Sequence, residues 1–177
     1  ATNTWSQKAD FGGTGRAYAV GFAINGKGYM GTGGDFLAHH NDFWEYDPTT
    51  NSWTQKANVG DTLREAAVAF TIGGKGYIGT GDNSSGYKKD FWEYDAASDT
   101  WTQKTDFPGT ARQAATGFSI GDKGYLGTGW DGTSLHTDFW QYNPATDTWT
   151  QKENFPGTER SYAVGFNIGT TGYVPTA

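Results

Sequence analysis

The sequence contains no cysteine and one methionine, and only 5 of its 177 residues are proline. Without cysteine, neither a disulfide-stabilised scaffold nor a metal site with thiolate ligands exists in this chain. Basic residues are also few, because 13 lysines and arginines stand against 19 aspartates and glutamates, a net charge of −6. Surfaces that hold nucleic acid through its phosphates are normally basic, so we expect no nucleic-acid partner. No apolar run approaches the roughly 20 residues of a transmembrane helix, so we expect no membrane insertion.

What the sequence does contain is glycine, with 27 residues, and aromatic side chains, with 8 Trp, 10 Tyr and 11 Phe. Both recur at a fixed spacing of 48 residues, which indicates a repeat architecture. The shared unit begins at an arginine, continues through Lys-Gly-Tyr and Gly-Thr-Gly, and ends with Asp-Phe-Trp and Trp-Thr-Gln-Lys. Two of the repeated positions are occupied by Arg16, Arg64, Arg112 and Arg160, and by Trp5, Trp53, Trp101 and Trp149.

Each unit predicts four short strands. In the unit that starts at Arg64, larger and small residues alternate over residues 66–72, as in a half-buried strand. The pair Gly73-Gly74 follows and matches Asn25-Gly26 one unit earlier, and Asn-Gly supplies the positive φ of a tight hairpin turn. The other predicted elements of this unit are strands at 75–80, 90–95 and 100–104, a loop at 82–89 and a turn at 96–99. No apolar period of 3.6 is long enough for a helix, so the predicted fold class is all-β.

Four antiparallel strands per 48-residue unit predict the blades of a β-propeller, which stack around a central axis to bury their faces. Large rings are expected between the blades, away from the axis, and the repeated tryptophans supply them. Residues 1–177 then form a single propeller segment of about three and a half blades. Its predicted parts are the fourth strand of a preceding blade in 1–15, complete blades in 16–63, 64–111 and 112–159, and the first two strands of a further blade in 160–177.

The unit resembles the Kelch repeat of the galactose-oxidase-like central domain superfamily. The resemblance is carried by a glycine-containing end of the second strand, an aromatic-x-Tyr-Asp third strand, and a Trp six residues after that Asp. These are Gly-Thr-Gly at 31–33, 79–81 and 127–129, then Tyr46-Asp47, Tyr94-Asp95 and Tyr142-Asn143, then Trp53, Trp101 and Trp149. Gly-Thr-Gly stands where the family usually has an adjacent glycine pair. The whole chain is similar to Kelch propellers of bacterial surface and secreted proteins more than to animal ones, which implies an extracellular or cell-surface location.

Kelch propellers usually close with six or seven blades, so three and a half blades leave three arrangements open. The chain is a fragment of a longer propeller, or a half-ring that associates with another copy to complete itself, or a four-bladed ring that lacks one strand. Self-association is therefore one of the expected interactions of this chain.

The four repeated arginines open the first strand of each unit, which is the innermost strand of a propeller blade. We therefore expect Arg16, Arg64, Arg112 and Arg160 to surround one mouth of the central channel. Guanidinium groups suit carboxylate, phosphate or sulfate ligands, and the Kelch resemblance implies such a role, because Kelch domains that bind acidic peptides often anchor them on arginines there. The alternative is structural, with each arginine bonded to carbonyls of the preceding loop or to an acid of the next blade. The aspartates before each Phe-Trp pair are predicted to make a structural hydrogen bond rather than to bind calcium; they are Asp42, Asp90 and Asp138.

Positions that differ between otherwise matching units are the better candidates for contact with a partner, and the alternative is neutral drift of exposed loops. Beside the arginines these positions hold Glu65, Gln113, Ser161, Tyr18 and Tyr162. In the loops between the second and third strands they hold Asp35, Phe36, His39, His40, Tyr87, Lys88, Trp130, Asp131 and His136. Both sets connect strand ends that point the same way, so we expect them on one face of the molecule.

We predict no metal and no cofactor. His39 and His40 are adjacent, so on an extended chain they point to opposite sides, and no carboxylate motif completes a metal site with them or with His136. Copper radical oxidases share the Kelch propeller, but their cofactor contains a cysteine crosslinked to tyrosine, and this chain has no cysteine.

The sequence therefore predicts a non-catalytic binding module whose channel mouth and variable loops hold a protein segment or a glycan. Two alternatives stay open. One is an enzyme similar to sialic acid mutarotases or other glycan-processing Kelch proteins, with Glu65 and Glu159 beside the arginines as acid–base candidates. The other is a structural repeat that assembles with other copies into a closed ring or a filament.

Overall fold

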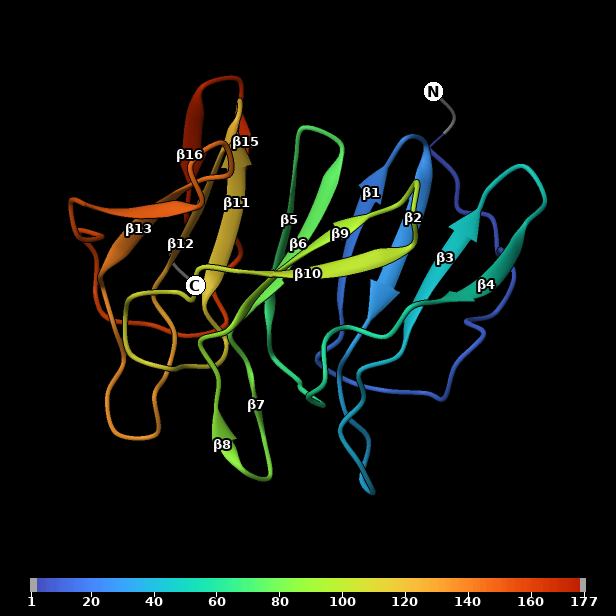
Figure 1. Ribbon diagram of the computed structural model, residues 1–177, viewed down its shortest axis with the longest axis horizontal. Coiled ribbons are helices and arrows are strands. Elements are labelled where there is room, and N and C mark those ends of the chain that lie inside the picture. The colour runs from blue at the N-terminus through green and yellow to red at the C-terminus, as the bar shows by residue number, and fades with distance from the viewer. Residues whose placement is uncertain (1–2, 176–177) are drawn as a thin grey trace.

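The computed structural model describes residues 3–175, so the outermost predicted boundaries, at 1 and 177, lie outside the described residues. All regular elements are β-strands (Figure 1), and no helix in this range is long and apolar enough to cross a membrane. Three antiparallel sheets have four strands each. They are β1 (Val20–Ile24), β2 (Lys27–Gly31), β3 (Phe43–Asp47) and β4 (Ser52–Lys56); β5 (Val68–Ile72), β6 (Lys75–Gly79), β9 (Phe91–Asp95) and β10 (Thr100–Lys104); and β11 (Thr116–Ile120), β12 (Lys123–Gly127), β13 (Phe139–Asn143) and β14 (Thr148–Lys152). Two short hairpins are β7 (Asp82–Asn83) with β8 (Gly86–Tyr87), and β15 (Phe166–Ile168) with β16 (Thr171–Tyr173).

Tight turns set the register of each sheet. Strands β1 and β2 pair from Val20 with Gly31 to Ile24 with Lys27, around the turn Asn25-Gly26. The two turn residues have φ of 50° and 79°, which is the conformation a two-residue hairpin requires and which Asn and Gly adopt readily. The equivalent hairpins β5–β6 and β11–β12 pair in the same register, so the three sheets present equivalent faces.

The sheets stand side by side with their first strands innermost, as in a β-propeller. Strand β1 contacts β5, β5 contacts β11, and β11 contacts β15, while β4, β10 and β14 are the strands farthest from this line. A series of backbone hydrogen bonds runs along the inner side: the Ala66 N–H donates to Tyr18, Ala114 to Ala66, and Tyr162 to Ala114. The architecture is therefore an all-β, propeller-like arrangement of four-stranded antiparallel sheets.

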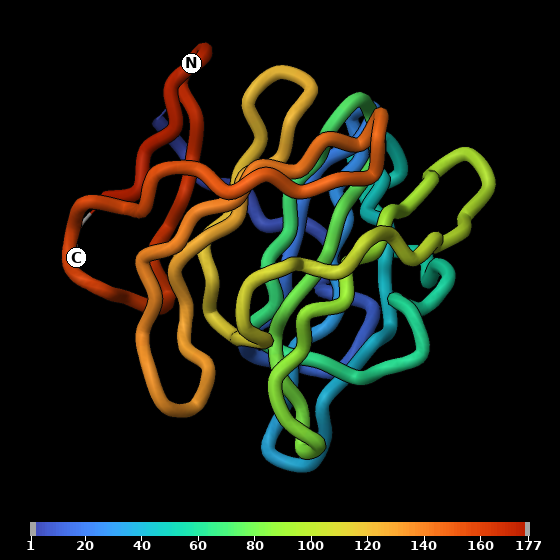
Figure 2. Tube along the Cα trace, turned by 60° about the vertical axis from the view of Figure 1, so that its left-hand side comes forward, coloured from blue at the N-terminus to red at the C-terminus, as the bar shows by residue number. Residues whose placement is uncertain are grey.

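Long loops and tight turns lie at opposite ends of the sheets. In Figure 1 the turns between first and second strands point upward, whereas the loops between second and third strands, including the hairpin β7–β8, point downward. Figure 2 shows the same loops projecting together in the rotated view. The scaffold thus presents its variable loops on one side, which we call the loop side.

A layer of rings holds neighbouring sheets together. Phe91 on β9 is fully buried, and its ring centroid lies 4.8 Å from that of Tyr142 and 5.0 Å from that of Trp149, both in the third sheet. Phe43 has the same position between the first and second sheets. Aromatic rings do lie between the sheets as expected, but Phe and Tyr form the buried layer, and the tryptophans of the third and fourth strands of each sheet are half-buried at its margin.

A pair of hydrogen bonds also ties each sheet to the connection that precedes it. Ala57, which follows β4, donates its N–H to Asp99 at 3.0 Å and accepts the indole N–H of Trp101 at 3.0 Å. The same pair of bonds joins Ala9 to Asn51 and Trp53, and Thr105 to Asp147 and Trp149. The repeated tryptophan of the fourth strand is therefore accounted for by the fold.

The structure departs from the expected elements in three places. The described part of the expected fourth strand in 1–15, residues 3–15, forms no strand, and the Trp5 side chain is fully exposed. The strand expected over 66–72 starts at Val68, because Ala66 has a φ of 48° and interrupts the extended conformation. The loop at 82–89 contains the hairpin β7–β8 rather than irregular chain alone.

The hairpin β15–β16 lies where the first two strands of a further unit were expected, and one of its faces is open. Val164 and Ile168 are 66% and 64% exposed, whereas Phe118, on the neighbouring strand β11, is buried.

Replacing Gly124 with alanine is expected to lower the free energy of unfolding by about 1–3 kcal/mol, because the new methyl group overpacks the layer between sheets. A Cβ on Gly124 would lie 2.4 Å from the ring of the buried Phe70 in the preceding sheet. Gly28 is the matched control, since it holds the same position in the first sheet and its Cβ would have only Tyr46 at 3.7 Å. Urea denaturation followed by tryptophan fluorescence should show Gly28→Ala unchanged or slightly stabilised. Equal losses in both variants would contradict sheet packing at this position.

Candidate functional site

The residues just before the innermost strands form a rim on the loop side. We call this the inner rim and define it as residues 16–18, 64–66, 112–114 and 160–162 together with Gly34, Asp82 and Trp130, which pair with the middle residues of the first three segments. The pairing is by short antiparallel bridges, Ala17 with Gly34, Glu65 with Asp82, and Gln113 with Trp130. The N–H groups of Gly33, Gly81 and Gly129 donate to the carbonyls of Arg64, Arg112 and Arg160 in the next unit, at 2.7–2.8 Å. The rim is therefore a rigid frame that crosses from one sheet to the next.

Three of the four rim arginines are buried in ion pairs. Arg64 donates to both carboxylate oxygens of Asp90, at 3.0 Å for the Nη1–Oδ1 bond, and to the carbonyl of Thr80 at 3.1 Å. The side chains of Arg16, Arg64 and Arg112 are at most 1% exposed, and their carboxylate partners are Asp42, Asp90 and Asp138. Their terminal nitrogens are bonded within the fold and shielded from solvent, which disfavours the predicted role of these three arginines as ligand anchors. The structural alternative holds, with the acid supplied by the same unit rather than the next.

The paired aspartates are also held by the tryptophan that follows. Asp90 accepts the indole N–H of Trp92 at 2.6 Å. Burial alone would raise the pKa of Asp90, but the hydrogen bonds and charge of Arg64 outweigh it and hold the pKa below the ordinary value of 3.8. The same balance lowers the pKa of Asp42 and Asp138. These aspartates make the structural hydrogen bonds that their register predicts.

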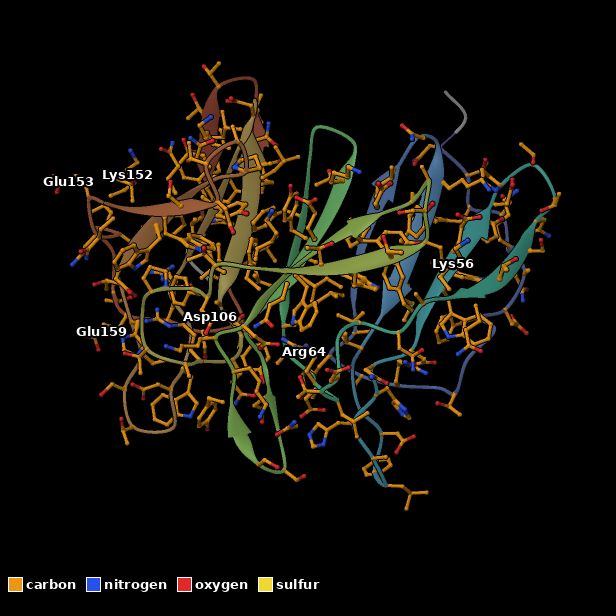
Figure 3. All side chains as sticks on the ribbon, viewed as in Figure 1. Lys56, Arg64, Asp106, Lys152, Glu153 and Glu159 are labelled. Atoms are coloured by element: carbon orange, nitrogen blue, oxygen red, sulfur yellow. The ribbon has the colours of Figure 1, made fainter. Side chains whose placement is uncertain are left out.

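Arg160 is different, because no carboxylate pairs with it among the described residues. Its guanidinium donates to the carbonyls of Thr158 and Pro175 and lies 4.5 Å from the centroid of the Phe155 ring. It lines an open pocket of about 540 Å³ whose other walls include Glu159, Ser161, Tyr162 and Val164. In Figure 3 Glu159 lies at one side of the molecule, away from Arg64. Glu65 precedes β5, whereas Glu159 lies between β14 and β15, so the two proposed acid–base residues come from different units.

One section of the rim combines a histidine with two carboxylates. His39, in the loop after β2, is paired through its backbone with Gly34, and the adjacent His40 is paired with Arg64. This pairing lays His39 against Glu65, with 3.8 Å between imidazole Nε2 and carboxylate Oε1. Ligand atoms of His39, Glu65 and Asp82 all lie within 4.8 Å of one another. We call these three residues the rim triad.

The rim triad carries excess negative charge. Burial, and then the negative charge of Glu65, raise the pKa of the Asp82 carboxyl above its ordinary value of 3.8. Asp82 Oδ1 is buried and has no hydrogen-bond partner. Among residues 3–175 no lysine or arginine forms a salt bridge with either carboxylate. The Glu65 carboxylate occupies the space where a side chain at Gly34 would be, because a Cβ there would lie 2.3 Å from Glu65 Oε2.

Tyr18 and Tyr162 complete this part of the rim. Their side chains are 55% and 56% exposed, and their ring centroids lie 5.7 Å apart although the residues belong to the first and last units. Both have positive φ, 55° and 57°, where the two intervening units have the buried residues Ala66 and Ala114. Burial, followed by the charges of Tyr18, Asp82 and Glu65, raises the pKa of Tyr162. The tyrosines and the rim triad thus share one electrostatic environment.

The next section of the rim has different chemistry on the same frame. Gln113 pairs with Trp130, and Trp130 also pairs with Leu135 at the far side of its loop. The ring of Tyr87 packs on Gly132, whose φ of 96° allows this approach. Lys88 accepts the Arg112 N–H through its carbonyl at 3.1 Å, so its backbone is part of the frame. Trp130 and Tyr87, both half-buried, make this section apolar.

Two of the variable loops are locked by an aspartate and a histidine. Asp35 accepts the N–H groups of Leu37 and Ala38 at 2.7 and 2.9 Å, and its other oxygen lies 3.1 Å from His40 Nε2. Asp131 and His136 repeat the arrangement, at 2.9 Å. The backbone N–H groups, then the histidine, lower the pKa of Asp35 below 3.8. Four predicted contact residues therefore shape their own loops, while Phe36 stands fully exposed at a loop tip.

Sequence reasoning missed Asp82 and the meeting of His39 with Glu65. His39 and His40 do face different partners, as expected: His40 faces Asp35 of its own loop, whereas the two carboxylates near His39 come from the next unit. A signal was available, because position 82 is occupied by Gly34 and Trp130 in the neighbouring units and therefore varies as strongly as position 65.

Comparisons with known proteins bear on the fold. No family model matches the chain, and no curated protein matches it in sequence. Among solved structures 175 chains match it, one of which is described as the structure of YjhT. That match has a TM-score of 0.82 at 20% identity and covers 94% of this chain and 60% of YjhT. The chain thus spans about 60% of the length of that protein. At this identity the likeness shows the fold alone, which is β-propeller-like.

Proposed function

We propose that the chain is a Kelch-type β-propeller segment of 48-residue blades that binds a glycan on its inner rim without transforming it. The observation that carries the proposal is the pair of exposed tyrosines at the rim, Tyr18 and Tyr162, held 5.7 Å apart on a rigid backbone. Exposed aromatic side chains on a rigid frame are the usual anchors of a binding surface. A cell-surface or extracellular location is part of this proposal.

The charges of the rim favour a neutral glycan over an acidic protein segment. Arg16, Arg64 and Arg112 are neutralised by their aspartates and shielded from solvent. The groups that do face the rim are tyrosine hydroxyls and the carboxylates of the rim triad, which accept hydrogen bonds from sugar hydroxyls. An acidic peptide would meet like charge there, and this juxtaposition is unfavourable.

Binding of the tag-free 177-residue chain to an array of neutral oligosaccharides tests the proposal. The double variant Tyr18→Ala/Tyr162→Ala is expected to lose at least about 10-fold in affinity for any oligosaccharide that the chain binds, since aromatic anchors contribute roughly 2 kcal/mol or more. Trp5→Ala is the matched control, because Trp5 is a fully exposed aromatic side chain outside the rim and the variable loops.

Two results would contradict the proposal. The first is unchanged affinity in the double variant, which would place the ligand elsewhere. The second is chemical conversion of the bound sugar by the wild-type chain, which would support the enzymatic alternative instead.

A further inference from the structure

The rim triad brings one imidazole and two carboxylates together from two sheets. His39 comes from the loop after β2, whereas Glu65 precedes β5 and Asp82 follows β6. The backbone bridge between Glu65 and Asp82 fixes the two carboxylates beside each other, and the bridge between His40 and Arg64 fixes the histidine. Each residue of the triad is itself part of a backbone bridge, His39 with Gly34 and Glu65 with Asp82.

A second observation points to a ligand at this place. Asp82 Oδ1 is buried without any hydrogen-bond partner, although buried carboxylate oxygens are normally satisfied. The neighbouring Glu65 is another carboxylate with a ligand atom within 4.8 Å, so two acceptors lie close together beside the histidine. Side chains of His39 and Glu65 are about a quarter exposed, which leaves the triad accessible from the loop side.

We infer that His39, Glu65 and Asp82 form a binding site for a divalent cation of the zinc class. An imidazole nitrogen with two carboxylate oxygens is a three-ligand set that zinc accepts, with a fourth position left for water. Calcium and magnesium prefer sites made of oxygen alone. Donors that bind zinc at about 2.0–2.2 Å in a tetrahedron lie roughly 3.4 Å apart. The ligand atoms of His39 and Glu65 are 3.8 Å apart, and those of all three residues lie within 4.8 Å of one another. Small side-chain rotations would therefore bring them to the separation that a tetrahedral zinc site requires.

The other units show that this chemistry belongs to a single section of the rim. The positions of His39, Glu65 and Asp82 are occupied one unit later by Tyr87, Gln113 and Trp130, none of which suits a cation of this class. The other histidine–carboxylate contacts, His40 with Asp35 and His136 with Asp131, have one carboxylate each. They are embedded in hydrogen bonds of their own loops, so they serve as internal controls.

Bound zinc would join the loop after β2 to the second sheet, since its ligands come from both. It would also neutralise the excess charge of the triad. The inference goes beyond the proposed glycan binding and does not depend on it, and its test contains no glycan.

Isothermal titration of Zn²⁺ into the tag-free, chelator-treated 177-residue chain at pH 7 tests the site, with Mg²⁺ and Ca²⁺ titrated in parallel. We expect one zinc per chain, and weaker binding of the other two ions. Glu65→Gln and Asp82→Asn are each expected to lower the zinc affinity by at least about 10–100-fold, the range seen even for residues behind the ligands. His39→Leu, which introduces the residue type of Leu135, should do the same.

The control is His136→Ala, which removes a histidine–carboxylate pair outside the triad and should leave the affinity unchanged. Circular dichroism of every variant separates loss of a ligand from loss of the fold. Absence of zinc binding, wild-type affinity in folded Glu65→Gln and Asp82→Asn, or loss of binding in His136→Ala would each overturn the inference. Tighter binding of Ca²⁺ or Mg²⁺ than of Zn²⁺ would overturn the assignment to the zinc class.

Discussion

Replacing Arg64 with alanine is expected to lower the free energy of unfolding by about 3–5 kcal/mol, measured by urea denaturation at pH 7. The Arg64 side chain is 0% exposed and neutralises Asp90, whose carboxylate is about one-fifth exposed. Removing the guanidinium leaves a largely buried negative charge that has lost its cationic partner and keeps the indole N–H of Trp92 as a donor. It also leaves the carbonyl of Thr80 without its donor. Arg64→Lys should recover only part of the loss, because an ammonium group cannot reproduce the two parallel bonds of the guanidinium fork.

Arg160→Ala provides the matched control, because Arg160 occupies the same position in the last unit but has no carboxylate partner among residues 3–175. Its loss should cost about 1 kcal/mol or less, the range of an exposed cation–π contact. Similar losses for the two variants would show that the ion pair with Asp90 is not what stabilises this position. A large loss of glycan affinity in folded Arg64→Lys would contradict the assignment of Arg64 to the fold.

Replacing Phe91 with alanine is expected to cost about 3–5 kcal/mol, because it removes a fully buried ring from the layer between the second and third sheets. Its ring centroid lies within 6 Å of those of Tyr77, Tyr142 and Trp149. The contacts with Tyr142 and Trp149 are edge to face, the contact with Tyr77 is stacked, and the loss of these ring contacts adds to the loss of buried area. Calorimetric or urea-induced unfolding measures the change.

Phe36→Ala is the control for this second variant, since the Phe36 side chain is fully exposed at a loop tip. Its removal should change the free energy of unfolding by no more than about 0.5 kcal/mol. A comparable loss in the two variants would contradict the position of Phe91 at the contact between sheets.

The ion pairs and the ring layer use the residues that repeat in every unit, so the candidate binding residues are those that differ between units. Residues that repeat in every unit, such as Arg64 and Trp101, are bonded within the scaffold. Residues that vary at the same rim positions, such as Glu65 and Tyr162, are the ones whose polar groups or rings reach the loop side. A rigid repeated frame therefore offers different chemistry at each section of the rim.

Much of the fold was predictable because its causes are local. The alternation before Gly73-Gly74 and the Asn25-Gly26 turn predict hairpins, and the structure has both in the expected register. The start of β5 was not predictable in this way. Ala66 has no intrinsic preference for positive φ, and its conformation goes with the hydrogen bond that it makes to Tyr18 in the preceding unit.

The candidate site was predictable only in part, because it depends on contacts between units. Register alone indicates that Tyr18, Tyr162 and Glu65 vary on one face. It does not indicate that Tyr18 and Tyr162 meet across four units, or that His39 lies against Glu65. Those contacts depend on how far each sheet rotates relative to the next, and packing of whole ring layers sets that rotation.

By itself the sequence determined the all-β class and the tight turns, which follow from residues close together in the chain, and the 48-residue period, which follows from the recurrence of the same residues. Only the tertiary structure decided what the repeated arginines do and what the rim offers. The same guanidinium group is a ligand anchor when exposed and a structural ion pair when buried, and burial is a property of the packed sheets rather than of the residue. Likewise, a histidine and two carboxylates separated by up to 43 positions become a candidate cation site only when the first two sheets pack side by side.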